Sequence, residues 1–162
     1  MILRLSKIAL VAAVAFILSL ICFNNLTDYD SNYNFVLHVL SMDTTFPGNK
    51  LMYRSITSPA VHQIFYGSII FWEGSTAVVL WVAVARLLQT VKGTAKDFAA
   101  KKSLAAIGLV ISLLLWFVAF ITVGGEWFVM WQSKIWNGQE AAFRMFACLG
   151  IILLYLMQPE PE

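Results

Sequence analysis

The chain has 162 residues, of which 60% are hydrophobic and 12% are charged, and its formal net charge is +2. A soluble domain carries roughly a quarter charged residues and fewer than half apolar ones. The composition therefore excludes an ordinary soluble globular protein and predicts an integral membrane protein. The small net charge gives no indication of a nucleic-acid partner, and the length leaves no room for a soluble domain beside one small helical bundle.

Four apolar segments are long enough to cross a hydrocarbon core about 30 Å thick. The first has a basic start like that of a signal peptide. Its apolar run is longer than a signal core, however, and no small-residue cleavage pattern precedes Asn24, so we expect an uncleaved span. We predict an all-α single domain, a bundle of four transmembrane helices at about residues 5–23, 59–88, 103–123 and 138–157.

Residues that commonly begin helices precede three of these segments. Ser58 is expected to cap the second span. Thr94 with Asp97 predicts a capping box, so the third helix should begin before its membrane part. Asn137 with Glu140 predicts the same arrangement for the fourth.

The connection between the first two spans, residues 24–58, is longer than a simple loop requires. Within it, Asn34 to Met42 is almost continuously apolar around His38. This pattern predicts a short helix that lies on, or dips into, the outer leaflet. A turn is expected next, at Pro47 and Gly48.

The distribution of basic residues predicts the orientation, because cytoplasmic loops carry an excess of Lys and Arg. Both termini are therefore expected in the cytoplasm, with residues 24–58 and 124–140 on the outer side. The side of the termini holds Arg4, Lys7, Arg86, Lys92, Lys96, Lys101 and Lys102, and the other side holds Lys50, Arg54, Lys134 and Arg144.

The second outer segment, GGEWFVMWQSKIWNGQE, is expected to form an interfacial hairpin. Trp127, Trp131 and Trp136 belong at the depth where amphipathic indoles are most favourable. They either anchor the third and fourth spans or form a lid or docking surface for a partner. Glu126, after the flexible pair Gly124–Gly125, is the one acid placed for outer-surface catalysis, but it lacks a convincing partner.

Small residues at helical spacing predict close helix packing within the membrane. Cys22 and Cys148 lie in apolar runs and are interpreted as small hydrophobic side chains, although a disulfide between them stays possible. The small residues are Ala12, Ala15 and Ser19 on the first span, Gly67 and Gly74 on the second, and Ala105, Gly108, Ser112 and Ala119 on the third.

Glu73 is an acid placed within a membrane span. It lies thirteen residues before Arg86, which marks the inner end of the helix, or about 20 Å at 1.5 Å per residue. Acids at this depth usually face the bundle interior, pair with a cation or take up a proton. Arg144 lies at a similar depth on the fourth span. We therefore predict an ion pair between Glu73 and Arg144, with Glu140 as a competing partner of the arginine.

A polar stripe leads to this acid along one face of the second span, formed by His62, Tyr66, Ile69 and Glu73. The stripe could be a proton path or the wall of a small ligand pocket, for example for a quinone head group. Alternatively, His62 and Tyr66 lie at the wet interface and Glu73 only joins helices. The candidate ligand or proton-path residues are His62, Tyr66, Glu73 and Arg144.

No cofactor or metal is predicted. A metal site on the outer face would use His38, Asp43, His62 and Glu126, but their spacing fits no metal motif. A buried haem with two histidine ligands is not expected either, because His38 lies in a loop and His62 at a helix mouth.

Three stretches together resemble a bacterial family of predicted small four-helix integral membrane proteins of unknown function. They are FVLHVLSMDTTFPGN, FWEGS and VGGEWFVMWQSKIWNGQEAAFR. The resemblance covers nearly the whole chain and implies four transmembrane helices in the bacterial inner membrane. It provides no catalytic residues.

Two functions follow as hypotheses. The first is an accessory or assembly subunit of a larger inner-membrane complex, possibly respiratory, that docks on other integral membrane subunits through its outer loops and helix faces. The alternative is a binding or carrier protein for a quinone, a lipid or protons that uses the stripe around Glu73. An enzyme is the less favoured class, since no reactive constellation is present. Membrane lipids are expected partners in each case.

Overall fold

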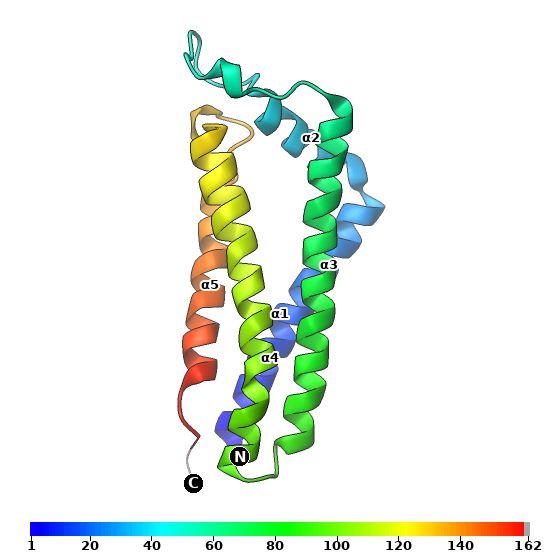
Figure 1. Ribbon diagram of the computed structural model, residues 1–162, viewed down its shortest axis with the longest axis vertical. Helices are drawn as coiled ribbons and strands as arrows, with labels where there is room; N and C mark the ends of the chain where they lie inside the picture. The colour runs from blue at the N-terminus through cyan, green and yellow to red at the C-terminus, as the bar shows by residue number, and fades with distance from the viewer. Residues whose placement is uncertain (161–162) are drawn as a thin grey trace.

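The computed structural model describes residues 1–160, and this part of the protein consists of helices and connecting segments without a β-strand (Figure 1). The long helices are α1 (Ile2–Thr27), α3 (Pro59–Thr90), α4 (Ala95–Leu114), which continues into the π-helix η2 (Leu115–Trp127), and α5 (Gln139–Met157). The short ones are α2 (Tyr29–Ser41) and the 3-10 turns η1 (Met52–Arg54) and η3 (Met130–Gln132).

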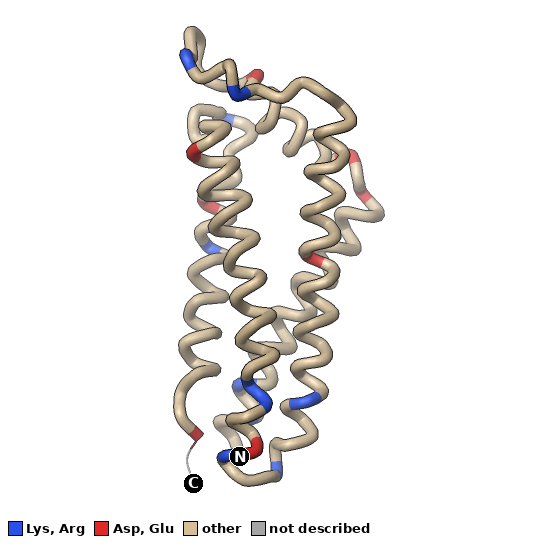
Figure 2. Tube along the Cα trace, in the orientation of Figure 1, with Lys and Arg blue, Asp and Glu red and all other residues tan. Residues whose placement is uncertain are grey.

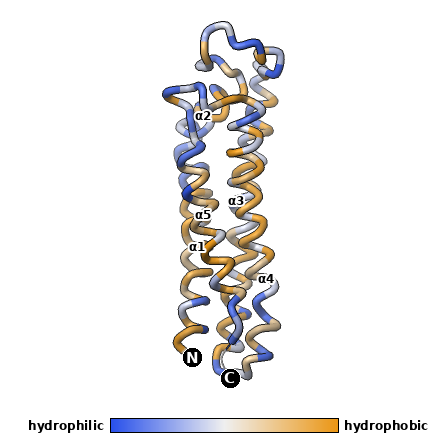
Figure 3. The backbone as a smooth tube through the Cα atoms, turned by 90° about the vertical axis from the view of Figure 1, so that its left-hand side faces the viewer, coloured by the Kyte–Doolittle hydropathy of each residue, from blue (hydrophilic) through white to orange (hydrophobic). Residues whose placement is uncertain are grey.

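Each of the four predicted apolar segments forms a long helix. α1, α3, α4 with η2, and α5 are each long and apolar enough to cross a membrane. Hydrophobic residues dominate the middle of the bundle (Figure 3), whereas charged residues gather towards its two ends (Figure 2). Arg4 and Glu160 lie close together, so the start and the end of the described chain share one end of the bundle.

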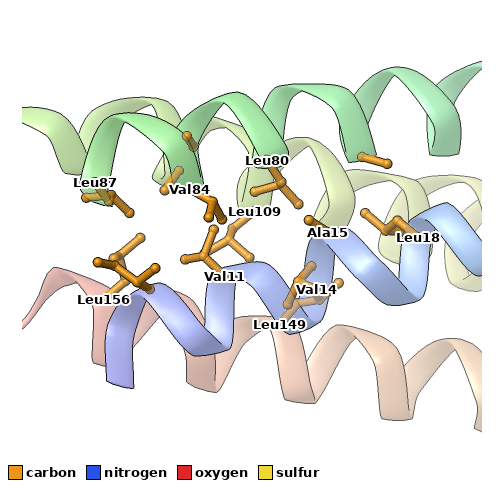
Figure 4. Packing of buried hydrophobic residues seen from close by; sticks show 14 of the residues in the cluster. Val11, Val14, Ala15, Leu18, Leu80, Val84, Leu87, Leu109, Leu149 and Leu156 are labelled. Atoms are coloured by element: carbon orange, nitrogen blue, oxygen red, sulfur yellow. The ribbon is translucent and has the colours of Figure 1, made fainter. Parts of the chain in front are cut away.

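The core of the bundle is centred on α1 (Figure 4). Val11, Ala15 and Leu18 of α1 have no exposed surface. They meet Leu80 and neighbouring side chains of α3 on one side and those of α5 on the other. Since lipid is as apolar as these side chains, their close packing stabilises the bundle more than their removal from water.

The small-residue prediction holds on α4 and only in part on α3. Gly108 lies so close to α3 that a Cβ there would be 2.6 Å from Cδ2 of Leu80. A Cβ on Gly74 would lie 3.1 Å from the Cys22 sulfur. Gly67, by contrast, is exposed and has no neighbour within 4 Å of a Cβ position, so it does not mediate packing.

The predicted N-terminal cap residues are found at two of the three helices. The Thr94–Asp97 capping box is present, and Ser58 is the N-cap of α3, although its side chain makes no capping bond. α5 starts one residue later than predicted, with Gly138 as its N-cap. Asn137 instead accepts a bond from the Gln139 N–H at 3.1 Å, so the capping box predicted there is not formed.

The predicted helix of the first outer loop is present as α2, which begins at Tyr29 rather than Asn34. It ends at Ser41, and its C-cap residue Met42 adopts a left-handed conformation. The loop then returns, and the Ile56 N–H bonds to the Leu40 carbonyl at 2.8 Å. α2 therefore packs across the end of the bundle opposite the termini (Figure 1).

The second half of the third span is a π-helix, which the hydropathy pattern did not predict. Its wider winding shows in the Thr122 hydroxyl, which donates to the carbonyl of Phe117 five residues earlier. Gly124 and Gly125, interpreted from the sequence as a flexible pair, lie inside this helix. Both are buried in η2, where Cβ atoms would lie 3.2 Å from the Met130 sulfur and 2.3 Å from the Gln139 amide nitrogen, respectively.

Candidate ligand-binding cavity

Three residues of the α3 stripe face the interior, including His62 and Tyr66, for which the sequence also allowed a position at the wet interface. His62, Tyr66 and Glu73 are 2%, 1% and 2% exposed. Their spacing of four and seven residues places them on the face of α3 that packs against α1 and α2. The stripe is thus part of the protein interior.

His62 holds the outer loop and does not continue the stripe to Glu73. One ring nitrogen, Nε2, lies 2.7 Å from the Ile56 carbonyl, and the other, Nδ1, has no partner among the described residues. Tyr66 is the next polar side chain inward, and its hydroxyl donates to the backbone carbonyl of Asn25 at 3.4 Å.

Glu73 is bonded by an amide of α1. The Asn25 side chain donates from Nδ2 to Glu73 Oε2 at 2.7 Å, and its Oδ1 accepts a bond of 2.6 Å from Asn32 of α2. A chain of three polar side chains therefore runs from α2 through α1 to α3. Each bond satisfies a buried group that would otherwise be costly in an apolar surrounding.

The predicted ion pair between Glu73 and Arg144 is wrong. No ion pair joins these two described residues, and Arg144 is exposed. α5 presents Ala142 and Leu149 to the core, and at 100° per residue Arg144 lies about 200° from Ala142. Depth along the helix was insufficient to predict the pair because the rotation of α5 turns the arginine outward.

A cavity of about 210 Å³ lies beside Glu73. It is lined by side chains of α1, α2, α3, η2 and the start of α5, so all four candidate spans and the outer helix contribute. The lining residues are Ile21, Asn25, Asn32, Phe35, Val36, Tyr66, Ile69, Glu73, Trp116, Phe120, Gly138 and Ala141.

A second cavity of about 250 Å³ adjoins the first and is lined almost entirely by apolar side chains of α2, α3 and η2. The two cavities share Phe35, Val36, Ile69 and Phe120 as lining residues. Together they form an amphipathic space, with its polar groups at Glu73 and its apolar part between α3 and η2.

Trp116 lines the cavity beside Glu73 and carries an unused hydrogen-bond donor. Its side chain is 8% exposed, and its indole N–H has no partner among the described residues. One turn earlier, the buried Ser112 hydroxyl is also unpaired. A buried donor without an acceptor costs about 1–3 kcal/mol, so such a group calls for an explanation, of which a bound water, ion or ligand is one.

The three outer tryptophans do not form one surface. Trp127 and Trp131 are 52% and 46% exposed. Trp136 instead stacks on His38, with ring centroids 4.7 Å apart, and so packs against α2. Glu126 is exposed and forms no ion pair within the described chain.

The candidate metal residues are not assembled. His38 bonds to Asp43 at 2.7 Å, while His62 contacts the loop carbonyl described above. Within residues 1–160 no group of three or more His, Cys, Asp or Glu side chains is arranged to hold a metal ion. Cys22 and Cys148 are both free thiols.

Sequence reasoning missed Asn25, Asn32 and Trp116. A signal for Asn25 was present, because it continues the seven-residue spacing of Val11 and Leu18 on the buried face of α1. The predicted first span ends at Phe23, two residues before Asn25, so the buried face of the helix was not followed as far as the asparagine. No signal in the sequence distinguishes Trp116 from the other apolar residues of its span.

An all-α bundle with four helices able to cross a membrane defines this chain as a small helical integral membrane protein. It belongs to the family described as predicted small integral membrane protein (DUF2165), which it matches over residues 3–159. This match confirms the family resemblance inferred from its sequence. No curated protein and no solved structure matches the chain.

Proposed function

We propose that the protein binds a lipophilic small molecule whose polar head lies beside Glu73 and Trp116 and whose apolar part occupies the adjoining cavity. The observation that carries this proposal is the unpaired indole N–H of Trp116, a residue that lines the same cavity as the buried Glu73. A cavity that is mostly apolar with a few convergent polar groups is the usual form of a small-molecule site.

The lining chemistry favours a planar head group with a carbonyl oxygen. The Trp116 N–H can only donate, so its partner must be an acceptor. The rings of Trp116 and Phe120 lie 4.9 Å apart, and Phe35 is 6.3 Å from Phe120, so aromatic faces surround the space. A quinone combines a planar ring, carbonyl acceptors and a hydrocarbon tail, and is the class that these features fit best.

Access from the bilayer is consistent with such a ligand. The apolar cavity is lined by Phe65, which is 38% exposed on the outer surface of α3. A hydrocarbon tail could therefore extend between α3 and η2 towards lipid, while its head reaches Glu73.

The test is calorimetric titration of the purified protein in detergent with a short-chain benzoquinone. We expect saturable binding that weakens about tenfold in Trp116→Phe, since roughly 1.4 kcal/mol of hydrogen bonding is lost. Glu73→Gln should also alter the affinity while the protein stays folded. Trp81→Phe is the control, because Trp81 bonds to Ser19 and does not line the cavity.

Equal affinities for the parent protein, Trp116→Phe and Trp81→Phe would contradict the proposal, as would the absence of saturable binding. If Glu73→Gln prevents assembly, the acid is structural, and Trp116→Phe then decides the question alone.

A second candidate is an accessory or assembly subunit of a larger membrane complex, such as a respiratory complex. The observation in its favour is the outward face of α5, where Arg144 is exposed beside Phe143 and has no ion-pair partner in residues 1–160. A cation exposed on a membrane-spanning helix is favourable when another subunit or a lipid head group covers it.

Native-detergent purification followed by identification of the bound subunits tests this candidate. Other integral membrane subunits should co-purify with the parent protein and be lost with Arg144→Gln. They should be kept with Lys134→Gln, which removes a charge from the same outer region. A clean monomer from the parent protein would count against an accessory role.

For the membrane placement, we propose the bacterial inner membrane with both termini in the cytoplasm. The excess of basic residues at the end of the termini supports this orientation. In this placement α2 lies at the outer interface, and Trp127 and Trp131 reach the outer head groups.

A further inference from the structure

Two buried lysines bind the C-terminal segment at the end of the bundle that holds the termini. Lys7 of α1 and Lys102 of α4 are 2% and 5% exposed. Their ammonium groups donate to the Gln158 carbonyl at 2.6 and 2.7 Å. Both also pair with the carboxylate of Glu160, Lys7 at 2.6 Å, and the Arg4 guanidinium lies 3.8 Å from the same carboxylate.

This cationic cluster, Arg4, Lys7 and Lys102, is a built anion site. Glu160 is the one acid that forms ion pairs with it in residues 1–160, so three cations face one described carboxylate. The Glu160 side chain is 1% exposed, which shows that the cluster holds its anion away from bulk solvent. Arrangements of this kind between membrane helices bind anionic lipid head groups.

An apolar groove of about 430 Å³ lies between α1 and α5 next to the cluster. Ser6 and Tyr155 line it and are joined by a hydrogen bond of 2.7 Å. The ring of Tyr155 lies 6.0 Å from the Lys7 ammonium group, which places the groove directly beside the cations. The groove is lined by Ser6, Ala9, Leu10, Ile151, Ile152 and Tyr155.

We propose that the cationic cluster and the groove form a binding site for an acidic phospholipid, and that the C-terminal segment competes with its head group. An acyl chain matches the apolar groove, and a phosphate matches the ammonium and guanidinium groups that now hold Glu160. Glu160 thereby acts as an internal substitute for the lipid phosphate. This inference is independent of the cavity at Glu73.

Lipid titration in neutral detergent, followed by native mass spectrometry, tests the proposal. The parent protein should retain phosphatidylglycerol in preference to phosphatidylcholine. Lys7→Gln should reduce the retention of phosphatidylglycerol about fivefold, as expected for one cation near a lipid phosphate. Lys101→Gln is the matched control, since it removes a charge next to Lys102 from an exposed position.

The decisive variants are Glu160→Gln and a chain that ends at Met157, because both should increase the affinity for phosphatidylglycerol by removing the competing carboxylate. A purely structural cluster would lose stability in these variants without binding more lipid. Inorganic phosphate serves as the comparison ligand. If it binds as well as the lipid, the groove contributes nothing and the lipid assignment is overturned, as it is if neither tail variant binds more phosphatidylglycerol.

Discussion

Glu73 illustrates how a carboxyl group is accommodated inside an apolar bundle. It is bonded by a neutral amide, Asn25, and not by the cation expected from helix depth. A neutral donor avoids the removal of a second charge from water, which makes buried ion pairs expensive. The carboxyl group thus stays next to the cavity without a permanent positive partner, and this arrangement leaves it available to a bound ligand.

Replacing Asn25 with leucine should leave Glu73 without its donor and lower the free energy of unfolding by about 1–3 kcal/mol. The additional change Glu73→Leu should restore part of the loss, because both partners are then apolar. Thermal unfolding of the single and double variants in detergent measures this coupling. Additive losses in the double variant would show that the Asn25–Glu73 bond does not stabilise the bundle.

The ion pairs of Glu160, at the opposite end of the molecule, should make the stability of the protein depend on pH. Burial raises the pKa of its carboxyl group, but the hydrogen bonds from Lys102 and Lys7 outweigh burial and hold the pKa below its usual value of 4.5. A group with a lowered pKa stabilises the folded state above its unfolded pKa, and this contribution is lost as the pH falls through the folded pKa.

The parent protein should therefore exceed Glu160→Gln in thermal midpoint at pH 7, and this difference should shrink progressively below about pH 4.5. Melting curves of both proteins between pH 3 and pH 7 provide the measurement. A difference that stays constant across this range would mean that the Glu160 ion pairs contribute no stability.

At the scale of elements, the approach of α4 to α3 is set by Gly108. Because Gly108 has no side chain, the fully buried Leu80 packs directly against it. A Cβ at position 108 would lie only 2.6 Å from Cδ2 of Leu80. Farther along the same span, η2 changes to π winding, and Trp116 and Phe120 line the cavity beside Glu73 together. The third span therefore packs tightly in one half and encloses space in the other.

Gly108→Ala should destabilise the protein by about 1–3 kcal/mol, the usual cost of overpacking a filled core. Gly150→Ala is the matched control, because a Cβ there meets nothing within 4 Å and alanine favours a helix more than glycine does. Thermal midpoints of the two variants should move in opposite directions. A Gly108→Ala protein as stable as the parent would show that the α3–α4 contact adjusts freely.

At the scale of the whole molecule, the two ends of the bundle differ in charge and in construction. The end of the termini carries the lysine cluster, whereas α2 and the two loops cover the other end (Figures 1 and 2). Four candidate spans, an even number, would keep the two ends of the described chain on one side of a membrane, in agreement with the contact between Arg4 and Glu160.

The proposed orientation can be measured with reporter fusions. Green fluorescent protein joined to the C-terminus should fluoresce, and alkaline phosphatase at the same position should be inactive, because both termini are expected in the cytoplasm. Alkaline phosphatase inserted after Asn49 in the first outer loop should be active. The reverse pattern would invert the orientation and assign the lysine cluster to the outer leaflet.

The sequence alone predicted the parts of this protein that depend on local properties. Hydropathy predicted four long apolar helices, most of whose ends agree with the structure to within a few residues, and the Thr94–Asp97 pair predicted the cap of α4. The stripe of Tyr66 and Glu73 was also predicted to lie on one face of α3, since helical spacing determines which residues share a face.

The tertiary structure alone decided which side chains meet across the helices. The rotation of α5 turns Arg144 away from Glu73, and the extra turn of α1 brings Asn25 to the acid. The return of the C-terminal segment onto Lys7 likewise depends on the arrangement of α1, α4 and α5. Hydropathy is a property of each segment, whereas helix rotation results from the packing of all segments together, so it cannot be obtained from any one of them.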